Sequence, residues 1–241
     1  MRVTVASISR EAGGDAATML ATLQHLADLG LSACVADRDS SSAFRRRITA
    51  MGHDVISTDN GLRGQMEAAF EGAAKKGSHV LYMESDKLLF ATEAARATIA
   101  RYRRRGLDYA VVGRTRRLFE TYPLAQRAIE RAQSTLISAT VGIPGDWVAG
   151  PALMPSEHVA TLRDSRFYGA AENGWSVPWY LLGRAWRDGL RVGLVNTAIA
   201  VAPLVPDEFN PGYRLTQAYS ILGGFYEGAG IAYDWREPTP P

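Results

Sequence analysis

The sequence of 241 residues contains a single cysteine, Cys34, which stands inside an apolar run. One cysteine cannot form a disulfide framework or a multi-cysteine metal site within one chain. The four histidines are scattered without the spacing of metal ligands, so we expect all of them to be structural. The scarcity of thiols fits a reducing compartment and predicts a cytoplasmic protein.

Long apolar runs are also missing. No stretch reaches the roughly 18 apolar residues that a membrane-spanning helix needs, and the first residues, MRVTVASIS, lack the core of a signal peptide. We therefore expect neither export nor a transmembrane segment, while peripheral contact with a membrane stays open. The net charge of +2 and the lack of a recognised nucleic-acid-binding module argue against a nucleic-acid partner.

Basic residues are unevenly distributed and gather between positions 101 and 117. The run 101–105 is typical of a solvated helix face. The cluster 114–117 follows an apolar run, so it either binds a phosphorylated or carboxylated ligand or forms an exposed basic loop.

Short apolar runs alternate with amphipathic segments through most of the chain. This alternation predicts an α/β fold with a mainly parallel central sheet flanked by helices. We expect one domain over 1–236 and a tail over 237–241, and a homo-oligomer stays open. The expected strands are 3–9, 31–36, 53–57, 79–83, 109–113 and 190–203, and the expected helices include 42–51, 61–76, 92–105 and 124–139.

The segment HVLYMESD is an apolar strand that ends in two carboxylates, Glu84 and Asp86, one residue apart. In an extended segment both side chains project to the same side, so both can bind one Mn²⁺ or Mg²⁺ that bridges a diphosphate. The same pair would also suit a helix cap or a solvated turn. Further polar residues follow the first two strands, where ligands of parallel sheets bind.

Three segments resemble, in order and spacing, the A-type (GT-A) glycosyltransferase fold, and in particular its family 2-like group. They are VADRDSS (35–41), TDNGLRGQMEAAFEGA (58–73) and YMESD (82–86), and the match covers most of residues 1–90. The resemblance implies a Rossmann-like sheet and a metal-dependent hexosyltransferase that moves a sugar from a nucleoside-diphosphate sugar to a hydroxyl acceptor. It also implies a nucleotide-sugar half, 1–113, and an acceptor half, 114–236.

The resemblance implies donor and metal residues in the first half. Asp86 is the implied metal ligand and Glu84 the second one, although the family more often has Asp at the position of Glu84. For each implied donor residue except Asp37, an ordinary polar loop role is the alternative. The implied donor contacts are Ser7, Glu11, Asp37, Asp39, Arg63, Gln65 and Ser85.

The second half resembles the acceptor side of the family more weakly. VAGPALMP (148–155) resembles the segment in which a small residue, here Gly150, lets the acceptor approach the sugar. YGAAENGW (168–175) resembles the acidic motif that opens a helix, which makes Glu172 a candidate general base and Asn173 an acceptor contact. Stabilisation of a helix N-terminus is the alternative for Glu172. Arg114 is the expected anion contact of the acceptor.

Two other functions remain open. A sugar-phosphate nucleotidyltransferase shares a related sheet, but SREAGGDAA after the first strand lacks the full glycine-rich basic loop of that family. A non-catalytic nucleotide-binding protein of the same fold is favoured by Glu84 and by the absence of a histidine after His158 as a late metal ligand. Asp207 and Glu208 are the alternative late ligands. Residues 213–222 are expected to form a surface helix.

Overall fold

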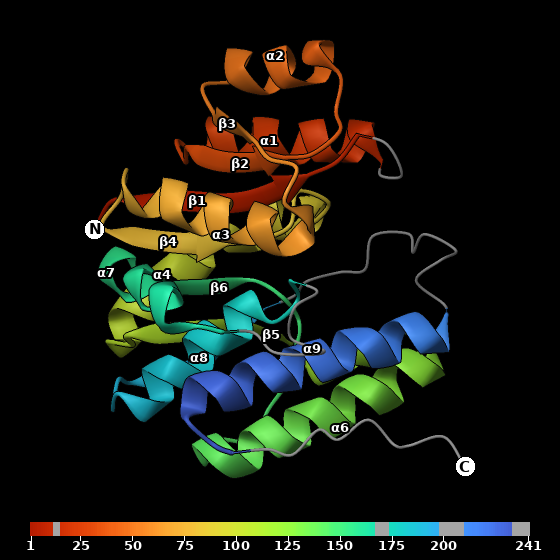
Figure 1. Ribbon diagram of the computed structural model, residues 1–241, viewed down its shortest axis with the longest axis vertical. Helices are drawn as coiled ribbons and strands as arrows, with labels where there is room; N and C mark the ends of the chain where they lie inside the picture. Colours follow the sequence, from red (N-terminus) through yellow and green to blue (C-terminus); the bar gives the residue numbers. More distant parts are fainter. Residues whose placement is uncertain (12–14, 167–173, 198–209, 233–241) are drawn as a thin grey trace.

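One sheet of seven strands runs through the described part of the molecule (Figure 1). The structure, a computed structural model, describes residues 1–11, 15–166, 174–197 and 210–232. All neighbouring strands are parallel except at the fifth position, whose strand is antiparallel to both neighbours. The expected α/β fold with a mainly parallel sheet is confirmed. In order across the sheet the strands are β3 (Asp54–Ser57), β2 (Ala33–Asp37), β1 (Val3–Ser9), β4 (His79–Tyr82), β6 (Ala152–Pro155), β5 (Tyr109–Arg114) and β7 (Val192–Thr197).

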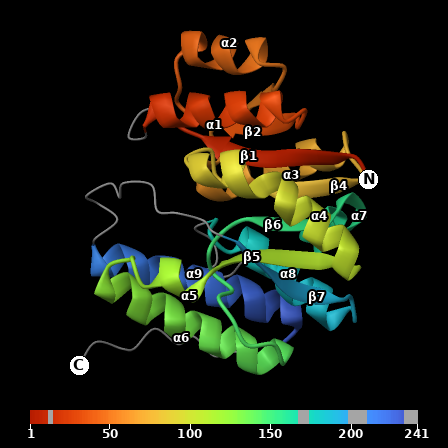
Figure 2. The ribbon, with the colours of Figure 1, turned by 180° about the vertical axis from the view of Figure 1, so that it is seen from behind.

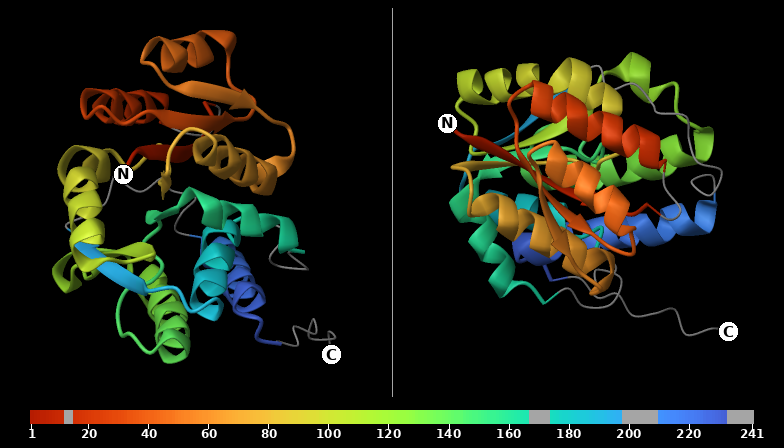
Figure 3. Two further views of the ribbon diagram at one scale, coloured as in Figure 1. Left: turned by 90° about the vertical axis from the view of Figure 1, so that its left-hand side faces the viewer. Right: turned by 90° about the horizontal axis from the view of Figure 1, so that it is seen from above.

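Helices cover both faces of this sheet, and Figure 3 (left) shows the sheet between the two helical layers. A π-helical turn, Phe90–Ala94, precedes α4, and a 3-10 turn, Ala160–Asp164, follows α7. Within the described residues, no helix has the length and apolar character needed to cross a membrane. The α-helices are α1 (Ala16–Asp28), α2 (Ser42–Ala50), α3 (Gly61–Ala74), α4 (Ala95–Arg105), α5 (Arg116–Phe119), α6 (Leu124–Val141), α7 (Ser156–Val159), α8 (Val177–Arg187) and α9 (Pro211–Ala229).

Alternate residues of the strands point into two separate cores. Ala6 and Tyr82 pack on the face that α3, α6, α8 and α9 cover. Val5 and Leu81, their neighbours in the chain, pack on the face that α1, α2 and α4 cover. The side chains of a strand alternate with a period of two, so apolar runs such as those of β1 and β4 are buried on both faces.

Strand β6 is not among the strands that the sequence predicts. It has four residues and pairs antiparallel with β4, with Tyr82 opposite Ala152, and with β5, with Val111 opposite Ala152. Because β6 runs against its neighbours, its first residue lies at the edge where the parallel strands end. The residues just before β6, Gly150 included, are thereby brought to the end of β4.

The arginine run of α4 is exposed to solvent, as predicted, and two of its members also contact the sheet. Arg101 Nη1 donates to the carbonyl of Asn196 at 2.7 Å, and Arg105 Nη1 donates to the carbonyl of Leu194. Both carbonyls belong to β7, which is the outer strand on this side of the described sheet (Figure 2). Bonds to the main chain of an edge strand oppose pairing with another chain.

Helix α9 contains the helix expected over residues 213–222. Its first half is at the surface, as expected, with Tyr213, Leu215 and Tyr219 exposed. Its second half is buried against α8, and Figure 1 shows α9 alongside α6. Glycines permit the close approach of α8 and α9. A Cβ at Gly228 would overlap the carbonyl oxygen of Tyr180, and a Cβ at Gly183 would overlap that of Phe225.

We predict that Gly228→Ala lowers the free energy of unfolding by about 1–3 kcal/mol, because the added methyl group has to push two packed backbones apart. Gly212→Ala, at the exposed start of the same helix, is the matched control, since its Cβ would meet only the Asn210 side chain. Urea unfolding of both variants measures the difference. Equal stabilities would contradict the close packing of α8 on α9.

Candidate active site

The end of β4 carries an acidic pair, Glu84 and Asp86, and the Lys87 side chain contacts both carboxylates. Lys87 Nζ lies 3.0 Å from Glu84 Oε2 and 3.1 Å from Asp86 Oδ1. The side chain of Glu84 is 17% exposed and that of Asp86 is 41% exposed, so the pair is open on one side. The two carboxylates therefore converge on one position at the carboxyl edge of the sheet.

The charges of this group raise two pKa values. Burial alone would lower the pKa of the Lys87 amine, but the carboxylates of Glu84 and Asp86 outweigh it and raise that pKa. Burial raises the pKa of the Tyr82 hydroxyl, and the two carboxylates raise it further. The Lys87 side chain therefore remains a cation at neutral pH, and Tyr82 remains a neutral donor, 3.4 Å from Glu84 Oε1.

Gly150 packs directly against the acidic pair. A Cβ built on it would lie 3.5 Å from Glu84 Oε2, and its φ of +115° lies in a region that favours glycine. The sequence predicted a small residue at an acceptor position here. The structure places Gly150 beside Glu84, and its contact with an acceptor stays a prediction.

Asp37, at the end of β2, is fully buried and accepts hydrogen bonds on both oxygens. Oδ1 accepts from Ser9 Oγ at 2.8 Å and from Ser40 Oγ at 2.5 Å, and Oδ2 pairs with Arg45 Nε at 2.7 Å. The carboxylate thus ties β1 and the start of α2 to β2. Arg45 carried no signal in the sequence, because it is an ordinary basic residue of an amphipathic helix.

Glu11 and Asp39 lie in the loops beside Asp37. Glu11 Oε2 accepts from the Ser41 amide at 2.7 Å, and the Glu11 amide donates to Ser40 Oγ at 2.9 Å. Asp39 is 58% exposed, pairs with Arg38 at 3.0 Å and has a φ of +61°, which is uncommon for a residue other than glycine. Asp39 is the accessible acid of this region, whereas Asp37 is enclosed.

Gln65, Ser85 and Ser7 lie beneath the surface of the same edge. Gln65 Nε2 donates to the carbonyls of Ser9 at 3.1 Å and Ala36 at 3.3 Å. Ser85 Oγ donates to the carbonyl of Ile8 at 2.8 Å. These two side chains hold the ends of β1, β2 and β4 together. Ser7 is fully buried, and its hydroxyl has no hydrogen-bond partner in the part of the chain that the structure describes.

The start of α3 lies against the segment that follows the predicted acceptor motif. Arg63 Nε pairs with Glu67 Oε1 at 2.9 Å, and the Arg63 side chain is 33% exposed. A Cβ on Gly174 would lie 2.5 Å from the Arg63 amide nitrogen. Glu172 and Asn173 lie outside the described residues. Gly174 shows that the chain just after them adjoins Arg63, a predicted donor residue.

Arg114, at the end of β5, is 2% exposed and belongs to a buried ionic network. Nε lies 2.7 Å from Asp146 Oδ2, and Nη2 lies 2.6 Å from Glu130 Oε2. The guanidinium also stacks on the rings of Phe119, at 4.9 Å, and Tyr122, at 4.4 Å. The structure therefore shows Arg114 anchoring the loop between β5 and α6, and its contact with an acceptor stays a prediction.

Glu84 and Asp86, at the end of β4, are together suited to bind one divalent cation. Glu84 and Asp86 offer oxygen ligands to one point, and Mg²⁺ in proteins is commonly held by one or two carboxylates plus phosphate oxygens and water. Over the described ranges, no group of three or more His, Cys, Asp or Glu residues could hold a metal. Asp207 and Glu208 lie outside those ranges.

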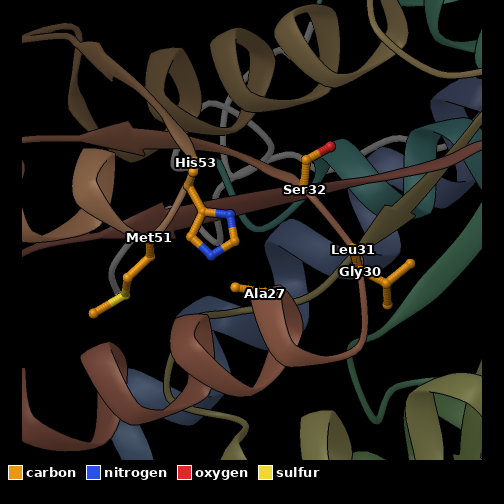
Figure 4. Close-up of a pocket in the computed structure, with 7 residues that line it drawn as sticks. Ala27, Gly30, Leu31, Ser32, Met51 and His53 are labelled. Carbon is orange, nitrogen blue, oxygen red and sulfur yellow. The ribbon is translucent and has the colours of Figure 1, made fainter.

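A pocket of about 190 Å³ lies at the amino ends of β2 and β3, away from the acidic pair (Figure 4). It is lined by His53 together with residues 27, 30–32, 51 and 52. His53 Nδ1 accepts from the Ala33 amide at 3.0 Å, and Nε2 donates to the carbonyl of Leu23 at 2.8 Å. Both ring nitrogens are engaged by the main chain, so His53 is structural, as predicted.

Comparison with solved structures gives the fold. No family profile matches the chain, and no curated protein matches it in sequence. Glucosyl-3-phosphoglycerate synthase of Mycobacterium tuberculosis, solved with Mn²⁺, UDP-glucose and phosphoglyceric acid, superposes with a TM-score of 0.62 at 17% identity, over 96% of this chain and 80% of that one. Mannosyl-3-phosphoglycerate synthase of Rubrobacter xylanophilus superposes with a TM-score of 0.64 at 15% identity, over 100% of this chain and 79% of that one.

The fold is that of the GT-A glycosyltransferases. The resemblance stated from three segments of the first half is confirmed at the level of the fold, and the superpositions extend it over the second half. In this protein the acidic pair follows β4, and the antiparallel pairing of β6 with β4 brings Gly150 to the same end of that strand.

We predict that Asp37→Asn lowers the free energy of unfolding by about 1.5–3 kcal/mol, because it removes a buried ion pair and places an amide among hydroxyl donors. Asp39→Asn is the matched control, since asparagine also tolerates a positive φ, and its change should stay within about 0.5 kcal/mol. Urea unfolding at neutral pH measures both. A larger loss in Asp39→Asn would contradict the enclosed position of Asp37.

Proposed function

We propose that the protein is a metal-dependent glycosyltransferase that moves a hexosyl unit from a nucleoside-diphosphate sugar to a hydroxyl group of a small anionic acceptor. The observation that carries the proposal is the convergence of Glu84 and Asp86 on one cation beside Gly150, at the carboxyl edge of a GT-A sheet. The neighbouring structures bind Mn²⁺, a UDP-sugar and phosphoglyceric acid, which supports this class of donor and acceptor.

Glu84 and Asp86 would hold Mn²⁺ or Mg²⁺ through their carboxylates. A divalent cation bound there neutralises negative charge on the diphosphate leaving group. The proposed metal site does not need many protein ligands, since diphosphate oxygens and water complete the coordination of such ions.

The donor would lie across the ends of β1, β2 and β4. Asp39 and Arg63 have partly exposed side chains there, so an acid is available to ribose or base hydroxyls and a guanidinium to phosphate oxygens. Asp37, Gln65 and Ser85 support this surface through buried hydrogen bonds to the ends of the strands. Their proposed role is to hold the donor site in shape.

The acceptor would enter over Gly150, where the lack of a side chain leaves room beside Glu84. Glu172 is the proposed acid that orients the acceptor hydroxyl or takes its proton, and Asn173 a neighbouring contact. Arg116 and Arg117 of α5 would attract an anionic acceptor, with Arg114 anchoring the segment that leads into α5 through Asp146 and Glu130.

We predict that one class of nucleoside-diphosphate sugar raises the melting temperature in the presence of Mn²⁺, because a ligand that binds the folded state stabilises it. UDP-, GDP-, ADP- and TDP-sugars are compared with and without Mn²⁺. Asp86→Asn should lose the Mn²⁺-dependent part of the shift, while Asp28→Asn, at the far end of α1, should keep it. Absence of a shift in the native protein with every donor would contradict the proposal.

We also predict turnover with an anionic acceptor. Release of the nucleoside diphosphate should be faster with phosphoglycerate than with glycerol, because the basic residues of α5 favour a charged acceptor. Glu172→Gln should lower kcat by about 10²-fold or more if the acid handles the acceptor proton. Pyrophosphate release from a nucleoside triphosphate and a sugar phosphate, without transfer to phosphoglycerate, would instead establish a nucleotidyltransferase.

A further inference from the structure

The cation that Glu84 and Asp86 share in this structure is supplied by the next residue of the chain. Lys87 Nζ lies within 3.0–3.3 Å of Glu84 Oε2 and both oxygens of Asp86. The Lys87 amide donates to the Glu84 carbonyl at 3.2 Å, which closes a turn and holds the lysine beside the acids. The position of the ammonium group is therefore set by the backbone as well as by charge.

This position is the one that a divalent cation would have to take. Two carboxylates brought to one point repel each other unless a cation lies between them, and here an ammonium group does so. A divalent cation and an ammonium group cannot occupy the same point, and they repel each other at short distance. The Lys87 side chain is 29% exposed, so it has a route away from the acids.

We infer that Lys87 is a tethered counter-cation of the acidic pair, and that the divalent cation and the diphosphate of the donor displace it together. The inference rests on the proposed function, since it takes Glu84 and Asp86 as the metal ligands. Lys87 leaves two partners when the metal binds, and the diphosphate offers its ammonium group new oxygen partners close by.

The displacement of Lys87 couples the binding of the divalent cation to the binding of the nucleoside diphosphate. Without a nucleoside diphosphate, Mn²⁺ has to break two ion pairs and leave the Lys87 ammonium group without a replacement. With the diphosphate present, the ammonium group is paired again, so the metal should bind more tightly. Each ligand then favours the other to the same extent, as linkage requires.

Mn²⁺ binding followed by electron paramagnetic resonance tests the inference without reference to catalysis. Free Mn²⁺ is measured for the native protein and Lys87→Met, each alone and with UDP or GDP, and titrations of nucleotide without protein correct for Mn²⁺ bound to the nucleotide. In the native protein we expect the nucleotide to tighten Mn²⁺ binding by about tenfold or more. In Lys87→Met, Mn²⁺ should bind more tightly without nucleotide, and the effect of the nucleotide should shrink.

Two further variants serve as controls. Lys87→Arg keeps a cation at this position and should behave like the native protein. Lys76→Met removes a lysine that pairs with Asp54 at the other end of α3, at 2.5 Å, and should leave Mn²⁺ binding unchanged. The native protein alone also tests the inference if Lys87→Met does not fold, because equal Mn²⁺ affinities with and without nucleotide would overturn it.

The outcomes separate the role of Lys87 from the proposed function. Mn²⁺ binding that Asp86→Asn abolishes but Lys87→Met leaves unchanged would overturn the inference and leave the metal site in place. Failure of Mn²⁺ to bind the native protein and Lys87→Met, with either nucleotide, would overturn both. Tighter binding in Lys87→Met with a reduced effect of nucleotide supports both.

Discussion

The pairing of β6 with β4 and β5 is the interaction on which the rest of the molecule depends. This four-residue strand joins the part of the sheet formed by β1–β4 to the part formed by β5 and β7. Its antiparallel direction also decides the position of Gly150, because the chain enters β6 at the edge where the parallel strands leave the sheet. A parallel strand at the same place would carry these residues to the opposite edge, away from Glu84.

Charge is arranged at this edge in two ways. Asp37 with Arg45, and Arg114 with Asp146 and Glu130, form enclosed networks in which at least one side chain is almost fully buried. Breaking such a pair leaves a buried charge without a partner, so these networks fix the loops that carry them. The side chains of Lys87 and Asp86 are 29% and 41% exposed, so their ion pair is open to exchange with a ligand. The same edge thus combines fixed networks with a group of charges that can rearrange.

The sequence predicted the elements whose signals are local. Strands β1 to β4 and helices α2 and α3 begin and end within a few residues of their expected positions, because apolar runs and turn residues mark them directly. Strand β6 was missed because a four-residue segment that follows one proline and ends in another has no period, and only pairing with β4 and β5 makes it a strand. The surface half of helix α9 was expected, whereas its buried half was not, because Gly224 and Gly228 gave no sign of the helix packed on them.

For the candidate site too, the sequence predicted some residues and missed the partners of others. Glu84, Asp86 and Gly150 do lie together, because a strand end and a small residue can both be identified from the sequence. The sequence could not show that Asp37 and Arg114 are engaged by charged partners 8 to 32 residues away. Lys87 could have been found, since a basic residue directly after two acids is visible in the sequence.

The adjacency of Lys87 and Asp86 in the chain has a consequence for how the edge responds to its surroundings. A cation attached through the backbone has an effective concentration that the geometry of a short turn sets, and dilution or a change of medium does not alter it. The acids therefore keep a counter-cation when divalent ions are scarce, and a divalent ion has to compete with that cation in order to bind. The turn over residues 84–87 therefore sets the concentration at which a free cation begins to compete with Lys87 for the two acids.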